Sequence, residues 1–394
     1  MINEWNSPKI IIGPVATGDY YYHRLEIVED IWEELEKGNF VLIAAPRRVG
    51  KTSVMKFMVE NPKENYKLIF ENIQGINSED DFYKMIYKLI LSCLNDSKKI
   101  KTWFKNYLKS KSISEVDFKG SFKITNQKID YLEEINNVIP QLDTDSENII
   151  LLIDELPEVL HNLYKNNKKE QAISILKNMR SWRQDSRFKK MQFVLAGSIG
   201  IHYVVNTIEG RNSDLNDLRK VYCNPLNWNQ TNEYIEWATR DATVKYNEEL
   251  KEYLLNKIQY FVPYFINIVL SEIDKTAKRN KNPEILTQSI DSAFEIVIKE
   301  NDHFKDWKKR LSDYLSNENF LFVNEILIQI AHKESITIQE IYDKAIKHNK
   351  TSDYMDFISD LEQDGYIIEN DKKYIFISPF LKEFWKRNNP IYNG

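Results

Sequence analysis

One short segment, Ala45-Pro46-Arg47-Arg48-Val49-Gly50-Lys51-Thr52-Ser53, most restricts how this chain folds. It follows an apolar run at 40–44 (FVLIA) and leads into helical spacing at Val54, Phe57 and Met58. The order strand, loop, helix is typical of a phosphate-binding loop, in which backbone N–H groups wrap phosphates at the start of a helix. We expect Lys51 to reach the β- and γ-phosphate oxygens of a nucleotide, Thr52 to ligate magnesium, and Gly50 to permit close backbone approach. The usual G-x-x-x-x-G-K-S/T pattern has glycine at position 45, where this chain has alanine, the smallest alternative.

A second apolar run, at 149–153 (IILLI), ends in the carboxylates Asp154 and Glu155. Such a run predicts a strand buried on both faces of a parallel sheet, and open α/β sheets bind ligands at the carboxyl ends of these strands. We expect Asp154 to hold magnesium through water and Glu155 to polarise the water that attacks the phosphate. Two alternatives remain open: the carboxylates only cap the next helix, or the site binds nucleotide and hydrolyses it very slowly.

A third buried strand is predicted at 191–196 (MQFVLA), followed by Gly197-Ser198-Ile199-Gly200. At the carboxyl end of this strand, Ser198 is a candidate sensor of the γ-phosphate. A simple turn that ends the strand fits the same residues equally well.

With these segments in place, the chain resembles the archaeal-type ATPases of the STAND class, which are relatives of the AAA+ proteins. The resemblance rests on APRRVGKTS as the phosphate loop, LLIDELPEVL around Asp154 and LAGSIG around Ser198. It extends to GDYYYHR before the loop, where His23 replaces a usual glycine, and to FVPY, where Phe261 replaces the glycine of a G-x-P element. The resemblance implies ATP and Mg²⁺ as ligands, nucleotide binding by residues 45–53, and a contact of Pro263 with adenine.

The carboxyl-terminal stretch predicts a winged helix, similar to that of the same family. It begins with a helix that Gly365 stops, continues as two strands at 366–368 and 374–377 with a turn at Asn370-Asp371, and ends in a short helix. The apolar positions are Tyr354, Phe357, Ile358 and Leu361 in the first helix and Phe380, Leu381, Phe384 and Trp385 in the last.

The fold class expected from these patterns is α/β. We expect a P-loop NTPase core with a parallel sheet at 1–225, carrying a basic insertion at about 94–145, then a helical lid at 226–315 and a winged-helix domain at 316–394. Apolar runs fall short of the roughly 18 residues that span a bilayer, and the opening MINEWNSPKI lacks an apolar signal region. We therefore expect a cytoplasmic protein without membrane contact. Cys93 and Cys223 form no ligand or disulfide pattern, so we expect two core residues.

The distribution of charge bears on the partner. The net charge of −5 excludes a nucleic-acid footprint over the whole chain. Between Lys98 and Lys128, however, nine lysines stand against Glu115 and Asp117, a sum of +7, and aromatic residues are interleaved. We expect this segment to be helical and then to form a hairpin around Gly120. Lysines and aromatics together suit DNA, and a solvated helix with inward aromatics is the alternative.

The predicted winged helix has the opposite charge. Residues 316–394 carry nine basic and thirteen acidic side chains, a sum of −4. Asp353, Asp356 and Asp360 have helical spacing on the expected recognition helix, where they would repel phosphates. This pattern favours a protein partner over duplex DNA.

ATPases of this organisation often receive an arginine from a neighbouring subunit, which stabilises charge on the γ-phosphate. The candidates are Arg180, Arg183, Arg187, Arg211 and Arg219. We favour Arg183, and surface ion pairing is the alternative for each of them.

Together these features predict a slow ATPase that acts as a molecular switch. Its nucleotide state would control binding of a protein effector or assembly into a homo-oligomer, and the resemblance suggests regulation or mobile-element defence as the setting. The alternative is an ATP-dependent DNA-binding protein of the initiator or transposition-regulator type that uses the segment at 98–128. A nucleotide-dependent scaffold without useful turnover is a third possibility.

Overall fold

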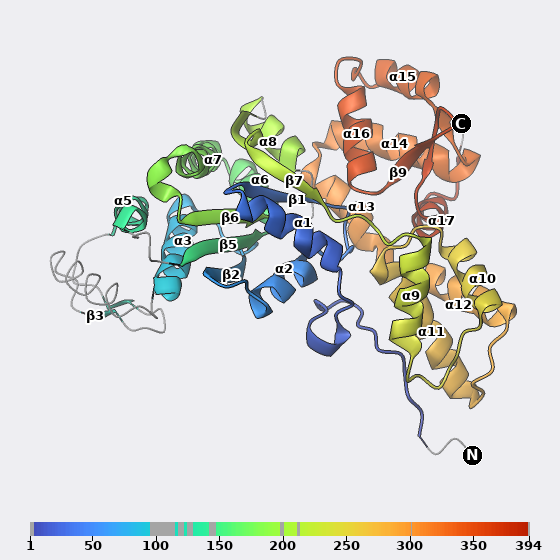
Figure 1. Ribbon diagram of the computed structural model, residues 1–394. Coiled ribbons are helices and arrows are strands. Elements are labelled where there is room, and N and C mark those ends of the chain that lie inside the picture. The colour runs from blue at the N-terminus through green and yellow to red at the C-terminus, as the bar shows by residue number, and fades with distance from the viewer. Residues whose placement is uncertain are drawn as a thin grey trace. The chain divides into compact units, whose positions relative to one another are not determined.

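The computed structural model describes residues 4–94, 115–116, 122–123, 129–141, 147–197, 201–210, 213–300 and 302–392 (Figure 1). The chain forms two compact units. The sheet unit comprises Arg24–Ala44 and Val54–Tyr222, and the helical unit comprises Met1–His23, Ala45–Ser53 and Cys223–Gly394. The predicted phosphate loop therefore belongs with the helical unit by its contacts, although the chain on both sides of it belongs to the sheet unit.

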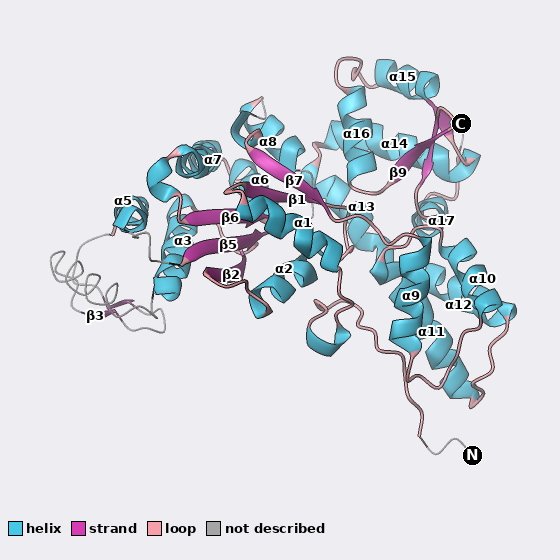
Figure 2. Cartoon of the chain, in the orientation of Figure 1, coloured by secondary structure: helices cyan, strands magenta, loops and turns pink. Residues whose placement is uncertain are grey.

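Five parallel strands form the sheet, in the order β2-β5-β6-β1-β7 (Figure 2). Their bounds are β1 Phe40–Ala44, β2 Tyr66–Asn72, β5 Asn148–Asp154, β6 Met191–Leu195 and β7 Leu218–Tyr222. The predicted burial is confirmed, because β6 is buried throughout and β5 is buried from Ile149 onward. Since the strands are parallel, the carboxyl ends of β1, β5 and β6 lie on one edge of the sheet.

Helices pack on this sheet and on one another. Their bounds are α1 Leu25–Glu36, α2 Lys51–Glu60, α3 Glu79–Leu94, α5 Tyr131–Val138, α6 Leu156–Lys165, α7 Lys169–Gln184 and α8 Ile201–Glu209. Helix α1 contacts β1 and β7, and α3 contacts β2 and β5. The core between these elements includes the fully buried rings of Phe82 and Phe193 and the nearly buried Trp182.

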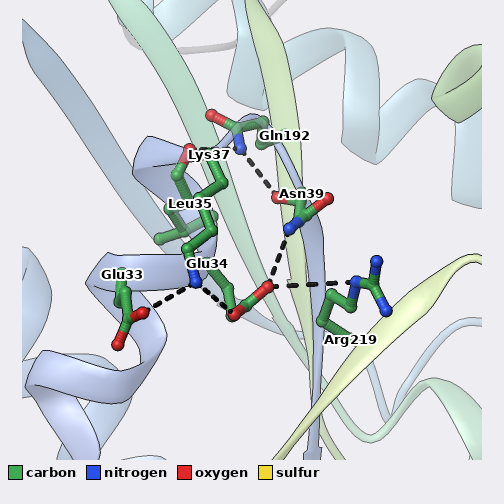
Figure 3. Close-up of polar contacts among 7 residues, drawn as sticks. All are labelled: Glu33, Glu34, Leu35, Lys37, Asn39, Gln192 and Arg219. Atoms are coloured by element: carbon green, nitrogen blue, oxygen red, sulfur yellow. Dashed lines mark hydrogen bonds and ion pairs between the residues drawn. The ribbon is translucent and has the colours of Figure 1, made fainter.

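A polar network joins the end of α1 to β6 and β7 (Figure 3). Gln192 of β6 is 5% exposed, and its Nε2 donates hydrogen bonds to the carbonyl oxygens of Leu35 and Asn39, at 2.9 and 2.7 Å. The Nδ2 of Asn39 donates to Glu34 Oε2 at 2.7 Å, and Nε of Arg219 lies 4.0 Å from the same oxygen. These contacts lie at the amino-terminal end of β1, opposite the edge where β5 and β6 end, and explain a polar residue inside a buried strand.

The helical unit contains α9 Trp228–Thr239, α10 Glu248–Ile258, α11 Pro263–Asn280, α12 Thr287–Lys299 and α13 Asp302–Tyr314. The sequence sets several of these helix starts. Asn227 and Gln230 form a capping box at α9, and the Asn247 side chain accepts from the Leu250 N–H at α10. Phe380 joins this part to the end of the chain, since its ring centroid lies 4.4 Å from that of Phe294.

Residues 316–392 form helices and a small antiparallel sheet. The elements are α14 Asn317–Lys333, β8 Ile336–Thr337, α15 Ile338–Lys347, α16 Tyr354–Gln363, β9 Ile367–Asn370, β10 Lys373–Phe376 and α17 Pro379–Asn388. The three strands pair in the order β8-β10-β9. Gly365 stops α16 as predicted, with φ +77°, while the Tyr366 N–H donates to the Leu361 carbonyl oxygen at 2.9 Å. The predicted turn lies one residue later than expected, since Asp371 and Lys372 have the positive φ angles that a tight hairpin requires.

Only part of the basic insertion lies within the described residues. There, β3 Glu115–Val116 pairs antiparallel with β4 Phe122–Lys123, as the predicted hairpin around Gly120 requires. The lysines at 98–111 fall outside the described residues. Cys93 and Cys223 are both buried, as expected. Among the helices of the described segments, none has the length and apolar character needed to traverse a bilayer.

Candidate functional site

The segment after β1 has the backbone of a tight loop. Arg48 and Gly50 have positive φ angles of 62° and 105°. An angle near +105° is open to glycine without strain, and a Cβ on Gly50 would meet no described atom within 4 Å, so conformation rather than space requires glycine here. Ala45 has no positive φ angle, so the alanine at the usual glycine position does not strain the backbone.

Lys51 opens α2 directly after this loop, and it is 7% exposed. Its Nζ donates to the carbonyl oxygens of Ala45 and Pro46, at 3.2 and 3.0 Å, so the ammonium group folds back over the loop. Thr52 and Ser53 complete the first turn of α2, and Val49 is buried beside them. The N–H groups of such a first turn have no acceptor within their own helix and attract anions.

Asp154 and Glu155 mark the end of β5. Asp154 is 1% exposed, and its Oδ1 accepts a hydrogen bond from the Glu155 N–H at 3.1 Å. Glu155 has a left-handed backbone, with φ 66° and ψ 27°, which is uncommon outside glycine and concentrates at functional sites. Although Glu155 is the N-cap residue of α6, its side chain makes no capping hydrogen bond. The geometry thus gives little support to a capping role for this carboxylate.

The ends of β5 and β6 are tied together. The Glu155 N–H donates to the Ala196 carbonyl oxygen, and the Ala196 N–H donates to that of Ile153, both at 2.9 Å. A Cβ on Gly197 would lie 2.5 Å from Cδ of Pro157, so only glycine fits where β6 passes the start of α6. Ser198 itself lies outside the described residues, and its role as a sensor stays a prediction.

The residues present suit magnesium bound together with a nucleotide. Magnesium prefers oxygen ligands and usually takes one or two from the protein and the rest from phosphates and water. Thr52 offers a hydroxyl in the first turn of α2, and Asp154 offers a buried carboxylate at the end of β5. Within the described segments, no three or more His, Cys, Asp or Glu side chains are grouped in a way that would hold a metal ion.

The first turn of α11 lies beside the loop within the helical unit. Pro263 begins this helix, and the Arg48 guanidinium lies 4.1 Å from the ring centroid of its neighbour, Tyr264. The Tyr264 hydroxyl is 2.9 Å from Nδ1 of His303 on α13. A contact of Pro263 with adenine stays a prediction.

Two further contacts hold the loop. Nη2 of Arg47 and Nη2 of Arg48 both lie 3.6 Å from Oδ2 of Asp306 on α13. At the end of α16, a Cβ on Gly365 would lie 3.1 Å from the Cβ of Pro46, so the loop and this helix end meet closely. Sequence reasoning missed Asp306 and Tyr264, because a charged or aromatic residue on an amphipathic helix carries no local signal of what it faces.

The arginine that we favoured as a trans-acting group is held within this chain. The Arg183 side chain is 2% exposed, and its Nε and Nη2 bind the two Asp217 carboxylate oxygens at 2.8 and 2.9 Å. This ion pair matches the alternative named for Arg183, and its role as a trans-acting group stays a prediction. Arg187 and Arg219 are 69% and 65% exposed, so they are the more accessible of the described candidates.

Comparison with known proteins supports the fold assignment. No family model and no curated protein matches the sequence. The structure is similar to a Walker-type ATPase, PABY2304 of Pyrococcus abyssi, with a TM-score of 0.59 and 17% identity, over 95% of this chain and 99% of that chain. It is also similar to the ORC2 protein of Aeropyrum pernix in ADPNP–ADP complexes, with a TM-score of 0.52 and 12% identity, over 92% of each chain. The chain therefore shares the fold of these proteins, an α/β fold with a parallel sheet, as its sequence predicts.

Proposed function

We propose that the chain binds ATP with magnesium, hydrolyses it slowly, and uses the nucleotide state as a switch for a protein partner or for self-assembly. The main support is the placement of the loop. It leaves the carboxyl end of β1, in a sheet where β5 ends on the same edge with Asp154 and Glu155. A strand, a tight loop with positive φ angles and a helix that starts at a buried lysine are the elements that phosphate-binding loops use, and they support the proposal.

Each residue has a proposed role. Lys51 would leave the loop carbonyls and bind the β- and γ-phosphate oxygens, while the N–H groups from Gly50 onward would bind the same phosphates. Thr52 and Asp154 would hold magnesium, which supplies neutralisation of phosphate charge. Glu155 would orient and polarise the attacking water, and Ser198 would contact the γ-phosphate.

The rest of the chain would respond to the nucleotide that is bound. We assign residues 226–315, with α9 to α13, as the lid, and residues 316–394, with the β8-β10-β9 sheet, as a winged-helix domain. The acidic balance of residues 316–394, with nine basic against thirteen acidic side chains, favours a basic or neutral protein surface as partner.

Nucleotide binding and turnover test the ATPase proposal directly. Wild type should bind ATP with magnesium by calorimetry, and Lys51→Ala should lose this binding because the phosphate charge is no longer matched. Glu155→Gln should bind ATP about as well as wild type, and its turnover should fall by about a hundredfold or more, since it loses the general base. Turnover unchanged in Glu155→Gln would contradict the assigned role, and absence of ATP binding to wild type would contradict the function.

The same assay addresses DNA. The +7 charge of residues 98–128 favours the alternative function, an ATP-dependent DNA-binding protein. If it holds, single-stranded or duplex DNA should stimulate turnover, and Lys98→Glu with Lys105→Glu should abolish that effect while sparing ATP binding. Turnover that DNA does not change would favour the molecular switch over the DNA-binding protein. Light scattering with and without ATP would then show whether the output is self-assembly.

A further inference from the structure

The two arginines of the loop, Arg47 and Arg48, contact side chains of α11 and α13. Both guanidinium groups reach one oxygen, Oδ2 of Asp306, at 3.6 Å, and Arg48 also stacks on Tyr264 at 4.1 Å. Their side chains are 15% and 23% exposed, whereas Asp306 is 55% exposed. The carboxylate is thus more exposed to solvent than the guanidinium groups that it contacts, and it belongs to α13, far along the chain.

The arginines have more positive charge than Asp306 neutralises. Burial, followed by the charges of Arg310 and Arg48, lowers the pKa of Arg47 to about 10. Lys51 adds a further buried cation in the same loop. Among the described residues, Nη1 of Arg47 and Nε of Arg48 are buried without a hydrogen-bond acceptor. Buried donors of this kind are costly, and they are satisfied when an anion with several oxygens enters.

We propose that Asp306 is an internal competitor of the nucleotide phosphates for Arg47 and Arg48. This inference rests on the proposed function of the loop. Without nucleotide, Asp306 and Tyr264 hold the arginines and so tie α13 and α11 to the loop. When the triphosphate binds, its oxygens take both guanidinium groups, because it offers several oxygens and more charge, whereas Asp306 contacts both arginines through one oxygen. The contact with α13 then loosens.

Competition makes the coupling reciprocal. If nucleotide weakens the contact between the loop and α13 by some factor, that contact must weaken nucleotide binding by the same factor. Exposed ion pairs each change an equilibrium by a factor of about 1.5 to 5. The two pairs share one carboxylate oxygen, so their effects do not multiply in full, and removal of its charge should tighten nucleotide binding about three- to tenfold.

The test uses the full chain and ATPγS with magnesium, whose affinity is measured by calorimetry. Asp306→Asn should bind ATPγS about three- to tenfold more tightly than wild type. Asp302→Asn is the matched control: it lies on the same helix, is 90% exposed and pairs with Lys305, away from the arginines. Its affinity should stay within about twofold of wild type. Equal affinity of Asp306→Asn and wild type, or the same gain in Asp302→Asn, would overturn the inference.

Hydrogen exchange of α13 gives a second readout. In wild type, ATPγS should speed amide exchange over residues 302–314, and in Asp306→Asn exchange should already be fast without nucleotide. Tyr264→Phe keeps the ring under Arg48 and should behave as wild type, whereas Tyr264→Leu should shift exchange in the direction of Asp306→Asn. Unchanged exchange in wild type on ATPγS binding would also overturn the inference. If ATPγS did not bind to wild type, the proposed function itself would be wrong. This outcome differs from those that overturn only the inference about Asp306.

Discussion

Replacing Asp360 with asparagine is expected to stabilise the folded protein above neutral pH. Asp360 lies on α16, with Asp356 and Asp364 one turn away on either side. Burial, followed by the charges of Asp364 and Asp356, raises the pKa of Asp360 from 3.8 to about 7. Asparagine has nearly the same size as aspartate and carries no charge, so the change removes this electrostatic cost without opening a cavity.

The magnitude follows from the shift in pKa. The folded state keeps the Asp360 proton to a higher pH than the unfolded chain, so the free energy of unfolding falls as pH rises from about 4 to about 7 and is then level. About three pH units at about 1.4 kcal/mol each give an upper limit of about 4 kcal/mol. The side chain is only partly buried, so we expect about half of that limit, about 2 kcal/mol above pH 7.

Urea unfolding at pH 5 and pH 8 measures this effect, followed by tryptophan fluorescence because Trp307 and Trp385 are buried in the same unit. The stability advantage of Asp360→Asn over wild type should grow by about 1 to 1.5 kcal/mol between these pH values. Asp356→Asn, at an exposed position, removes only a neighbouring charge and should give a smaller gain. An advantage of Asp360→Asn that does not change with pH would refute the reasoning.

Three substitutions in the sheet unit are expected to destabilise it, each measurable by urea unfolding. Gly197→Ala places a Cβ 2.5 Å from Cδ of Pro157, and we expect a loss of about 1 to 3 kcal/mol; a loss below the error would show that α6 shifts freely. Arg183→Met leaves Asp217 without its bidentate partner, and we expect a loss of about 1 to 2 kcal/mol because Asp217 is 31% exposed; Asp217→Asn should partly restore stability in the double variant. Gln192→Leu leaves two backbone carbonyl oxygens without their donor, at an expected cost of about 1 to 2 kcal/mol, and wild-type stability would mean that water replaces it.

Features with a local physical cause were predictable from the sequence. The apolar runs at 40–44 and 149–153 predict buried parallel strands because only a strand covered on both faces is apolar at every position. Gly50 and Gly365 predict a tight loop and a helix end because both positions need a positive φ angle. The candidate residues Lys51 and Asp154 follow from their places next to these strands.

Features that depend on tertiary contacts were not predictable. The strand order β2-β5-β6-β1-β7 is set by helix packing, which no single segment encodes. The left-handed backbone of Glu155 has no signal in its residue type, since glutamate seldom adopts it. Arg183 is predicted from sequence as a trans-acting group, and its ion pair with Asp217 becomes visible only in the structure.

The arginines of this chain form two kinds of ion pair with carboxylates. One kind suits a fixed contact and the other suits an exchangeable contact. Arg183 binds both oxygens of Asp217 at 2.8 and 2.9 Å through a side chain that is 2% exposed, and this bidentate geometry suits a fixed contact. Arg47 and Arg48 share one oxygen of a carboxylate that is 55% exposed, at 3.6 Å, and water can replace this contact at little cost. A competitor of phosphate must bind weakly enough to be displaced, and it must lie close enough to offset part of the positive charge of the loop when no nucleotide is bound. Asp306 meets both conditions, whereas a carboxylate that bound the arginines through both oxygens, as Asp217 binds Arg183, would hold the loop against nucleotide.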